Sequence, residues 1–298
     1  MDTMRALRVD NRAAPSLEVT EVPVPEPAIG DVLVRVEAAS LTPTELGWPS
    51  TWVDRRGVAR APSTPCHELC GEVVALGYGT FRFAVGDRVY GLTDWYRDGA
   101  AAEYVAVEAR DLAPSPASCR PVDAATVPLA GLSAWQALFE RGSLARDETV
   151  VVTGAAGGVG VFALQLAREA GATVIAAGRA AHEGVARELG ADEFVDLSEP
   201  GWPKRVDADL ALDLVGGAVV DELVTASVAR RIVSLVAPHD AVDFFVVEPD
   251  RPTLEELARR VDAGTLRPVV ADVVPLAESD RAFAATRGAA GKRVIEIA

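Results

Sequence analysis

Residues 150–160 read VVVTGAAGGVG, and this stretch decides the fold. An apolar run ends at Thr153, a glycine-rich turn follows at once, and an apolar helix is expected directly after it. A buried strand that leads through such a turn into a helix is typical of dinucleotide binding. Gly157 lets the backbone approach a pyrophosphate, and Gly160 lets the helix pack on the strand. Ala155 stands in the place of the fingerprint's first glycine, so a tight turn without a ligand stays open as an alternative.

The chain around this stretch alternates strands and helices between residues 122 and 264. The expected strands are 149–153, 174–177, 193–196, 209–215, 231–236 and 243–248, and the expected helices are 159–170, 182–189 and 253–262. Short, wholly apolar strands between helices indicate a parallel sheet that is covered on both faces. The sequence therefore predicts an α/β fold with a doubly wound parallel sheet.

The first 121 residues have a different pattern. Short strands are expected over 31–38, 71–77 and 86–91, separated by Gly, Pro and Asp turns, and a last strand over 292–297. Alternation with a period of two between such turns predicts an antiparallel, barrel-like domain.

Composition limits the function classes. The 298 residues carry a formal net charge of −15, which disfavours nucleic acid and anionic membrane surfaces as partners. Three cysteines, Cys66, Cys70 and Cys119, fit a reducing compartment better than a disulfide framework. No apolar run approaches the roughly 18 residues of a membrane span, and the first ten residues lack the apolar core of a signal peptide. We therefore expect a soluble, cytoplasmic protein.

The second strand of the parallel sheet bears on the choice of cofactor. NAD-specific folds carry Asp or Glu about 20 residues beyond the glycines, where it binds the ribose 2′-hydroxyl. Here the strand ends at Gly178 and Arg179, and a guanidinium can pair with a 2′-phosphate. This pattern predicts NADP(H), with an exposed arginine of no special role as the alternative.

Six segments together resemble the quinone oxidoreductase branch of the medium-chain dehydrogenase/reductase superfamily, in order and over essentially the whole chain. They are 102–107 (AEYVAV), 127–135 (VPLAGLSAW), 154–160 (GAAGGVG), 189–192 (LGAD), 213–217 (DLVGG) and 287–292 (RGAAGK). The resemblance implies a GroES-like β-barrel catalytic domain of residues 1–121 and 265–298. It also implies an inserted Rossmann NADP-binding domain of residues 122–264, an active site in the cleft between the two, and a homodimer.

The resemblance also implies which residues surround the cofactor. The glycine turn, a hydroxyl on the preceding helix and the loops after the later strands would contribute. The expected cofactor-binding residues are Ser133, Ala156, Gly157, Gly158, Val159, Gly178, Arg179, Leu197, Val215, Gly216, Leu235, Val236 and Ala237. Of these, Leu197 would pack on the adenine.

Zinc is the main competing chemistry, because Cys66, His67 and Glu68 are similar to a motif of the zinc-dependent branch. A catalytic zinc needs three side-chain ligands and one open position. By resemblance, Thr42 and Leu129 occupy the places of two ligands, and neither supplies a thiolate or an imidazole. Three cysteines are also too few for the four-cysteine structural zinc lobe. The expected metal content is none.

Without a metal, reduction of an isolated carbonyl is difficult, whereas a conjugated quinone or enone spreads the developing charge. The sequence therefore predicts an NADPH-dependent, zinc-independent oxidoreductase that acts on a quinone or an α,β-unsaturated carbonyl. A tailoring enoyl or keto reductase and a non-catalytic NADPH-binding protein are the alternatives. The expected substrate pocket is Thr42, Glu45, Trp48, Trp52, His67, Trp95 and Tyr96, with core packing as the other reading of the aromatic residues. No proton donor is assigned.

Overall fold

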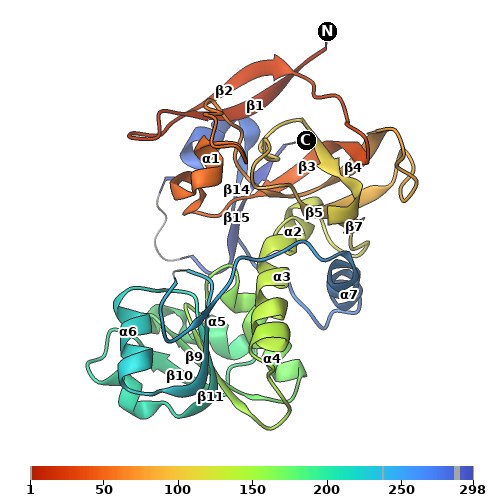
Figure 1. Ribbon diagram of the computed structural model, residues 1–298. Coiled ribbons are helices and arrows are strands. Elements are labelled where there is room, and N and C mark those ends of the chain that lie inside the picture. The colour runs from red at the N-terminus through yellow and green to blue at the C-terminus, as the bar shows by residue number, and fades with distance from the viewer. Residues whose placement is uncertain (1, 237, 285–288, 298) are drawn as a thin grey trace.

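Two sheets organise the chain in the computed structural model, which describes residues 2–236, 238–284 and 289–297. Figure 1 shows the mostly antiparallel sheet in the upper half of the molecule and the parallel sheet in the lower half, with helix α3 (Pro128–Trp135) between them. The two ends of the chain both belong to the upper half, so the parallel sheet is an insertion into it.

The lower sheet has six parallel strands in the order β10-β9-β8-β11-β12-β13. The strands are β8 (Thr149–Thr153), β9 (Thr173–Gly178), β10 (Glu193–Asp196), β11 (Ala208–Asp213), β12 (Ala229–Ser234) and β13 (Asp243–Phe244). Numbered from β8, this order is 3-2-1-4-5-6, the doubly wound Rossmann arrangement. The predicted α/β class is confirmed. Ligands of such sheets bind outside the carboxyl ends of the strands, where the order reverses between β8 and β11.

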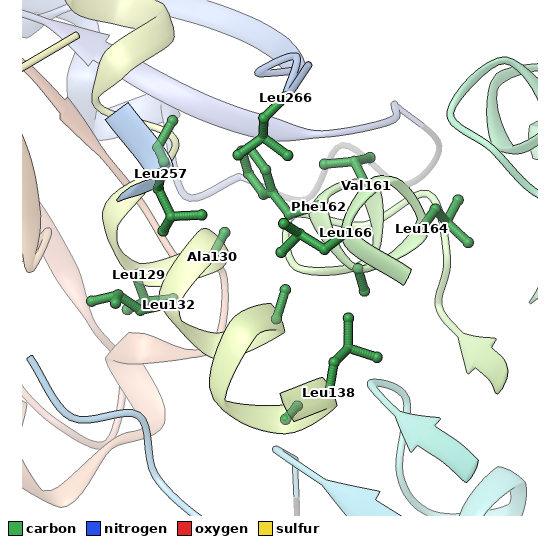
Figure 2. Close-up of a cluster of buried hydrophobic side chains, with 14 of the residues drawn as sticks. Leu129, Ala130, Leu132, Leu138, Val161, Phe162, Leu164, Leu166, Leu257 and Leu266 are labelled. Carbon is green, nitrogen blue, oxygen red and sulfur yellow. The ribbon is translucent and has the colours of Figure 1, made fainter. Parts of the chain in front are cut away.

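Helices cover this sheet and connect it to the rest of the chain. They are α4 (Gly160–Glu169), α5 (Glu183–Glu188), α6 (Ala218–Thr225) and α7 (Arg251–Asp262), with short 3-10 turns η4 (Ala180–His182) and η5 (Trp202–Arg205). Helix α7 begins two residues before the expected start, because the Asp250 carboxylate caps it by accepting from the Thr253 N–H at 3.1 Å. In Figure 2, Leu257 of α7 and Phe162 of α4 lie close to Ala130 of α3. This buried cluster holds the helices between the sheets.

The last strand of the parallel sheet is shorter than expected. A strand over 243–248 was predicted, but β13 contains two residues. The side chain of Gln136 explains the difference: its Nε2 donates to the Glu248 carbonyl at 2.8 Å, and its Oε1 accepts from the Glu248 N–H at 3.1 Å. These bonds take the backbone groups that a longer strand would offer to the sheet, and Pro249 follows. The six-residue prediction was therefore wrong.

The upper sheet has the order β14-β15-β3-β4-β5-β7, with β6 also paired to β3. Its strands are β3 (Asp31–Ser40), β4 (Glu68–Leu76), β5 (Arg88–Leu92), β6 (Tyr104–Glu108), β7 (Leu112–Pro114), β14 (Val270–Pro275) and β15 (Lys292–Glu296). Strands β1 (Thr3–Asp10) and β2 (Ser16–Pro23) form a separate hairpin, bonded to the rest through Leu7 N–H and Ala101 O at 2.8 Å. All pairs are antiparallel except β14 with β15.

Short helical turns complete the chain: η1 (Glu45–Gly47), α1 (Pro49–Trp52), η2 (Ala109–Asp111), α2 (Pro121–Ala124), η3 (Gln136–Arg141) and η6 (Leu276–Arg281). Helix α7 packs on α3 and α4 through Leu257 and also bonds to the upper half, since the Tyr90 hydroxyl of β5 donates to the Leu254 carbonyl and the Ser118 N–H donates to Asp262 at 2.8 Å. The domain bounds of 1–121 with 265–298, and of 122–264, therefore stay a proposal.

Candidate functional site

The glycine turn between β8 and α4 has the tight geometry that the sequence predicted. Gly154 takes the left-handed conformation at φ +65°, so the flexible residue of the turn directly precedes Ala155. A Cβ on Gly160 would overlap the Ala155 carbonyl oxygen, which is why the first residue of α4 is glycine. The strand and the helix can approach only because this position lacks a side chain.

A buried carboxylate joins three strand ends beside this turn. Asp213, the last residue of β11, accepts from the Thr153 hydroxyl of β8 at 3.1 Å and from the Ser234 hydroxyl of β12 at 2.8 Å. The same carboxylate accepts from the N–H groups of Val215 at 3.1 Å and Gly216 at 3.0 Å. Asp213 thereby holds the loop after β11 in place, at the point between β8 and β11 where the strand order reverses.

Sequence reasoning missed Asp213 as a site residue, although a signal was present. The strands β8, β11 and β12 each end on a polar residue that is wholly buried in the structure, namely Thr153, Asp213 and Ser234. Buried polar groups are almost always hydrogen-bonded, so polar ends on neighbouring strands predict one another as partners.

Two valines form an apolar edge next to the turn. Val215 is 43% exposed and Val236 is 47% exposed, although each follows a strand of the buried sheet. A Cβ on Gly154 would lie 3.2 Å from Val215 Cγ2, and one on Gly216 would lie 3.0 Å from Val236 Cγ1. The structure therefore brings the predicted cofactor-loop residues Val215, Gly216 and Val236 together beside Gly154 of the glycine turn, and the two valines give this edge an apolar face. Leu235 packs against the core beside them, and Ala237 lies outside the described residues.

The end of β9 carries the residues expected near the ribose. Arg179 is exposed, and no carboxylate of the described chain forms an ion pair with it. The Leu197 N–H donates to the Gly178 carbonyl at 2.9 Å, which places Leu197 beside this strand end. Sequence reasoning missed Asp196, whose carboxylate accepts from the N–H and hydroxyl of Ser198 at 2.9 and 2.8 Å. Both hydrogen bonds are accepted by Oδ1, and they lower the pKa of Asp196.

Ser133 has a different position from the other expected cofactor residues. It is buried within α3, with 2% of its surface exposed. The structure therefore does not place its side chain on the open edge that the glycine turn and the valines form.

The C-terminal tail closes over the glycine turn. The Gly291 N–H donates to the Ala156 carbonyl at 2.9 Å, and Gly291 forms a bridge with Gly157. The aliphatic stem of Lys292 follows, so that a Cβ on Gly158 would lie 2.8 Å from Lys292 Cγ. The tail motif 287–292 thus meets the glycine motif in space, although residues 287 and 288 lie outside the described part of the chain.

The ammonium of Lys292 forms an ion pair with the carboxylate of Glu68, the first residue of β4, and both side chains are buried. The other oxygen of Glu68 accepts from the Leu129 N–H at 3.0 Å. Burial raises the pKa of Glu68, and Lys292 opposes that effect. This ion pair connects the glycine turn with the strand that begins beside His67.

Glu45 lies in the same buried region and not on an open pocket wall. It is 1% exposed, and its Oε1 accepts from the Cys66 N–H at 3.0 Å. Burial raises the pKa of Glu45 to about 8, so the side chain is mostly neutral at pH 7. Burial also raises the pKa of the Cys66 thiol well above its usual range, so Cys66 is no thiolate nucleophile.

Three of the predicted pocket residues form one aromatic wall. The rings of Trp48 and Trp95 meet edge to face at 5.5 Å, and His67 meets Trp95 at 5.3 Å. His67 Nδ1 lies 2.7 Å from the Thr93 hydroxyl. Burial, with a smaller contribution from Arg60, lowers the pKa of His67 to about 4. The wall is therefore apolar and uncharged at neutral pH.

The remaining predicted pocket residues lie elsewhere. Trp52 is buried, and its indole N–H donates to the Leu46 carbonyl at 2.9 Å, as expected of a core residue. Tyr96 lies beneath the Arg55 guanidinium, 5.0 Å from ring centre to Cζ. Thr42 is half-buried in the loop before η1. Core packing was the alternative reading of Trp52, and the structure agrees with it.

Two hollows of about 500 and 460 Å³ lie in the upper half of the molecule. Neither is lined by a predicted cofactor or substrate residue. Arg97 lines both, and its guanidinium is paired with the buried Asp31 at 2.6 Å. Because neither hollow contains a predicted site residue, the strand-end region is the better candidate.

The donor set does not fit a metal. Within residues 2–236, 238–284 and 289–297, no three His, Cys, Asp or Glu side chains gather as ligands would. Near His67, the Glu68 oxygens are taken by Lys292 and a backbone N–H, and the Cys66 thiol stays protonated.

In the part of the chain that is described, no helix is long and apolar enough to cross a membrane.

Comparisons with known proteins agree with this geometry. Residues 28–117 match the alcohol dehydrogenase GroES-like domain, and residues 189–295 match the zinc-binding dehydrogenase domain. The chain is 35% identical to the chloroplast envelope quinone oxidoreductase homolog of Arabidopsis thaliana over 198 residues, which cover 63% of this chain and 58% of that relative. It is 27% identical to the mitochondrial NAD(P)H oxidoreductase RTN4IP1 of Danio rerio, over 90% of this chain and 84% of the relative.

A solved structure of the alcohol dehydrogenase type from Sinorhizobium meliloti 1021 is similar along its full length. It is 30% identical, covers 100% of this chain and 99% of its own, and superposes with a TM-score of 0.86. The names of the relatives support a nicotinamide-dependent oxidoreductase, and the first family model supports the GroES-like domain. The chain belongs to the medium-chain dehydrogenase/reductase superfamily, in its quinone oxidoreductase-like branch.

Proposed function

We propose that this protein is an NADPH-dependent, zinc-independent oxidoreductase that reduces a quinone or an α,β-unsaturated carbonyl. The observation that carries the proposal is the uncharged wall of Trp48, His67 and Trp95, next to a carboxylate and a thiol that are not free to bind metal. The quinone oxidoreductase name of the Arabidopsis relative supports the same substrate class.

The residues at the strand ends fit NADPH. The N–H groups of the glycine turn at the start of α4 would receive the pyrophosphate, and the exposed Arg179 would receive the 2′-phosphate. The apolar edge of Val215 and Val236 would flank the flat parts of the cofactor. When bound, the nicotinamide supplies the hydride.

The chain's own contribution to the reaction is placement and exclusion of water. The edge-to-face rings of Trp48, His67 and Trp95 offer an apolar aromatic surface against which a conjugated ring can pack, and the neutral His67 adds no positive charge that would hold an anionic product. A conjugated acceptor spreads the negative charge that hydride addition creates, so it needs less polarisation than an isolated ketone. This favours quinones and enones over simple ketones and aldehydes.

One experiment tests the activity and the metal together. NADPH and NADH oxidation are measured with quinones, enones, aldehydes and simple ketones, before and after treatment with a strong chelator, and zinc is measured by elemental analysis. We expect turnover of quinones or enones with NADPH, unchanged by chelation, and far less than one zinc per chain. Stoichiometric zinc, or activity that returns only with added zinc, would overturn the zinc-independent assignment.

Tight NADPH binding without any turnover would instead favour the non-catalytic alternative. A marked preference for one elaborate enone or ketone over simple quinones would favour the tailoring reductase. The cytoplasmic location stays a prediction, since the two relatives named above are chloroplast and mitochondrial proteins.

A further inference from the structure

The aromatic wall is assembled from three separate segments. Trp48 directly precedes α1, His67 directly precedes β4, and Trp95 lies in the loop after β5. The rings meet edge to face, and the distances and angles between them change when one segment shifts relative to another. The spacing between the Trp48, His67 and Trp95 rings therefore depends on the contacts that hold their three segments together.

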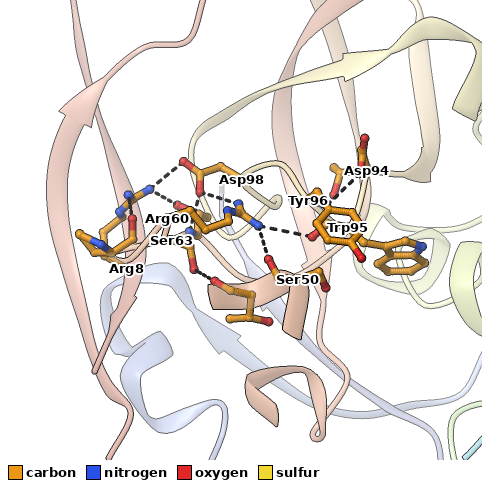
Figure 3. A network of polar contacts seen from close by, with 12 residues as sticks. Arg8, Ser50, Arg60, Ser63, Asp94, Trp95, Tyr96 and Asp98 are labelled. Atoms are coloured by element: carbon orange, nitrogen blue, oxygen red, sulfur yellow. Dashed lines mark hydrogen bonds and ion pairs between the residues drawn. The ribbon is translucent and has the colours of Figure 1, made fainter. Parts of the chain in front are cut away.

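One guanidinium bonds to two of these segments. Arg60 Nη1 donates to the Ser50 carbonyl of α1 at 2.7 Å and to the Trp95 carbonyl at 3.3 Å. Its Nη2 donates to Asp98 at 3.1 Å, further along the Trp95 loop. Figure 3 shows Arg60 between these groups, with Trp95 and Tyr96 on one side and Asp98 and Arg8 on the other.

Arg60 is itself held on both sides. Its backbone N–H donates to the Trp52 carbonyl at 3.1 Å, and its side chain is only 12% exposed. Asp98 also accepts from the Thr64 N–H at 2.9 Å and pairs with Arg8 of β1 at 2.9 Å (Figure 3). The guanidinium thus links α1 and the Trp95 loop to the hairpin that forms the edge of the upper half.

We infer that Arg60 is a specificity-determining positioning residue, which sets the spacing between the Trp48 and Trp95 segments and so the size of flat ring that the wall accepts. The inference rests on the proposed function, because the wall is its substrate surface. A planar guanidinium has five donors in a fixed fork, so it can serve two carbonyls and a carboxylate at once. An ammonium lacks this fixed geometry, and an apolar side chain leaves both carbonyls without a donor.

The test compares Arg60→Met and Arg60→Lys with Arg251→Met. Arg251 is a matched control, because its side chain is similarly buried, with 17% exposed, and also pairs with a carboxylate, but on α7. KM and kcat are measured for quinones of one, two and three fused rings, together with NADPH affinity and the near-ultraviolet circular dichroism of the tryptophans. The circular dichroism reports on the packing of the five tryptophans without any substrate, and the Arg251→Met control shows how the signal responds to a change away from Trp48 and Trp95.

For both Arg60 variants we expect KM to rise about tenfold or more, as for a lost pocket contact. We also expect a changed order of preference among the ring sizes, a weaker tryptophan signal and unchanged NADPH affinity. Arg251→Met should keep the original order and signal. Unchanged KM, ring-size order and tryptophan signal in either folded Arg60 variant would overturn the inference. If Arg60→Met does not fold, Arg60→Lys decides by the same readouts.

If the unmutated protein reduces no quinone or enone, the proposed function fails, but the positioning role is still tested. A tryptophan signal lost in the Arg60 variants and kept in Arg251→Met would support it, and an unchanged signal would overturn it.

Discussion

Lys292 of β15 forms a buried ion pair with Glu68 of β4, although 224 residues separate them along the chain. The stem of Lys292 lies against Gly158 of the glycine turn, and Glu68 directly follows His67 of the aromatic wall. One side chain therefore connects the predicted cofactor turn to the predicted substrate surface.

Replacing Lys292 with methionine should destabilise the protein strongly. Removal of one partner leaves a buried carboxylate without its cation, which costs about 3–5 kcal/mol of unfolding free energy. The double variant Glu68→Gln/Lys292→Met should regain most of that loss, because neither charge remains. Urea denaturation at pH 7 measures both. The exposed Lys204 provides the control, since Lys204→Met should change stability by less than about 0.5 kcal/mol. A Lys292→Met protein as stable as this control would contradict the prediction.

Glu45 should make stability fall as the pH rises. Burial raises its pKa from 4.5 to about 8, so its contribution is complete below pH 4.5 and is lost as the pH approaches 8. His67 acts in the opposite direction, with a pKa lowered from 6.5 to about 4, so its contribution is complete above pH 6.5. Of these two groups, only Glu45 therefore changes its contribution to the free energy of unfolding between pH 6.5 and 8.

Unfolding free energies across pH 6.5–8 test this. Relative to Glu45→Gln, the unmutated protein should lose up to about 1.4 kcal/mol per pH unit, the limit for one proton. Glutamine keeps an oxygen that can accept from the Cys66 N–H. A His67→Gln variant should show the same fall as the unmutated protein. Parallel curves for Glu45→Gln and the unmutated protein would show that Glu45 does not titrate in this range.

Asp213→Ala should weaken NADPH binding. Without the carboxylate, the hydroxyls of Thr153 and Ser234 and the N–H groups of Val215 and Gly216 lose their acceptor. Unsatisfied buried groups cost about 1–3 kcal/mol each, and relaxation of the loop after β11 relieves part of that cost. We expect NADPH affinity to fall at least about tenfold, measured by fluorescence titration.

Asp213→Asn is the matched control, because its amide oxygen can keep the contacts to Val215 and Gly216. It should retain most of the affinity. Unchanged affinity in Asp213→Ala would mean that the loop does not contact the cofactor.

Arg179→Asp should weaken the binding of NADPH much more than the binding of NADH. It replaces an attraction to the 2′-phosphate with a repulsion, so NADPH binding should weaken by about 2–4 kcal/mol, while NADH binding changes much less. Isothermal titration with each cofactor measures the difference. Arg82→Asp, an exposed position between β4 and β5, controls for net charge. Equal losses for both cofactors would remove Arg179 from the 2′ site.

The dimer prediction depends on the edge of the parallel sheet. Strand β13 is the outermost strand, and Val246 just beyond it is 61% exposed. An exposed apolar edge can pair with its counterpart across a two-fold axis. We expect Val246→Pro, which removes an N–H donor, to yield monomer or aggregate, while Val246→Ser keeps the donor and the dimer. Light scattering that gives the unmutated protein a mass near 31.3 kDa at micromolar concentration would exclude the dimer.

Local features of the sequence were enough to predict the parallel half of the fold. The bounds of β8 and β10 agree residue for residue with the predicted strands 149–153 and 193–196. Apolar runs, glycines and helix periodicity act over a few residues, so they can be recognised without knowing the partner strands. The glycine turn was predictable for the same reason, since the requirement at Gly160 comes from Ala155, five residues away.

Tertiary structure alone decided which polar and aromatic residues act together. The sequence shows Trp48, Trp52, Trp95 and Tyr96 as equivalent candidates, but only packing separates the wall from the core tryptophan and the arginine-covered tyrosine. Likewise, Glu68 is an ordinary acidic residue until the fold buries it against Lys292. The energy of a buried charge or hydrogen bond depends on its partner and on the loss of water, and both are set by contacts between distant segments.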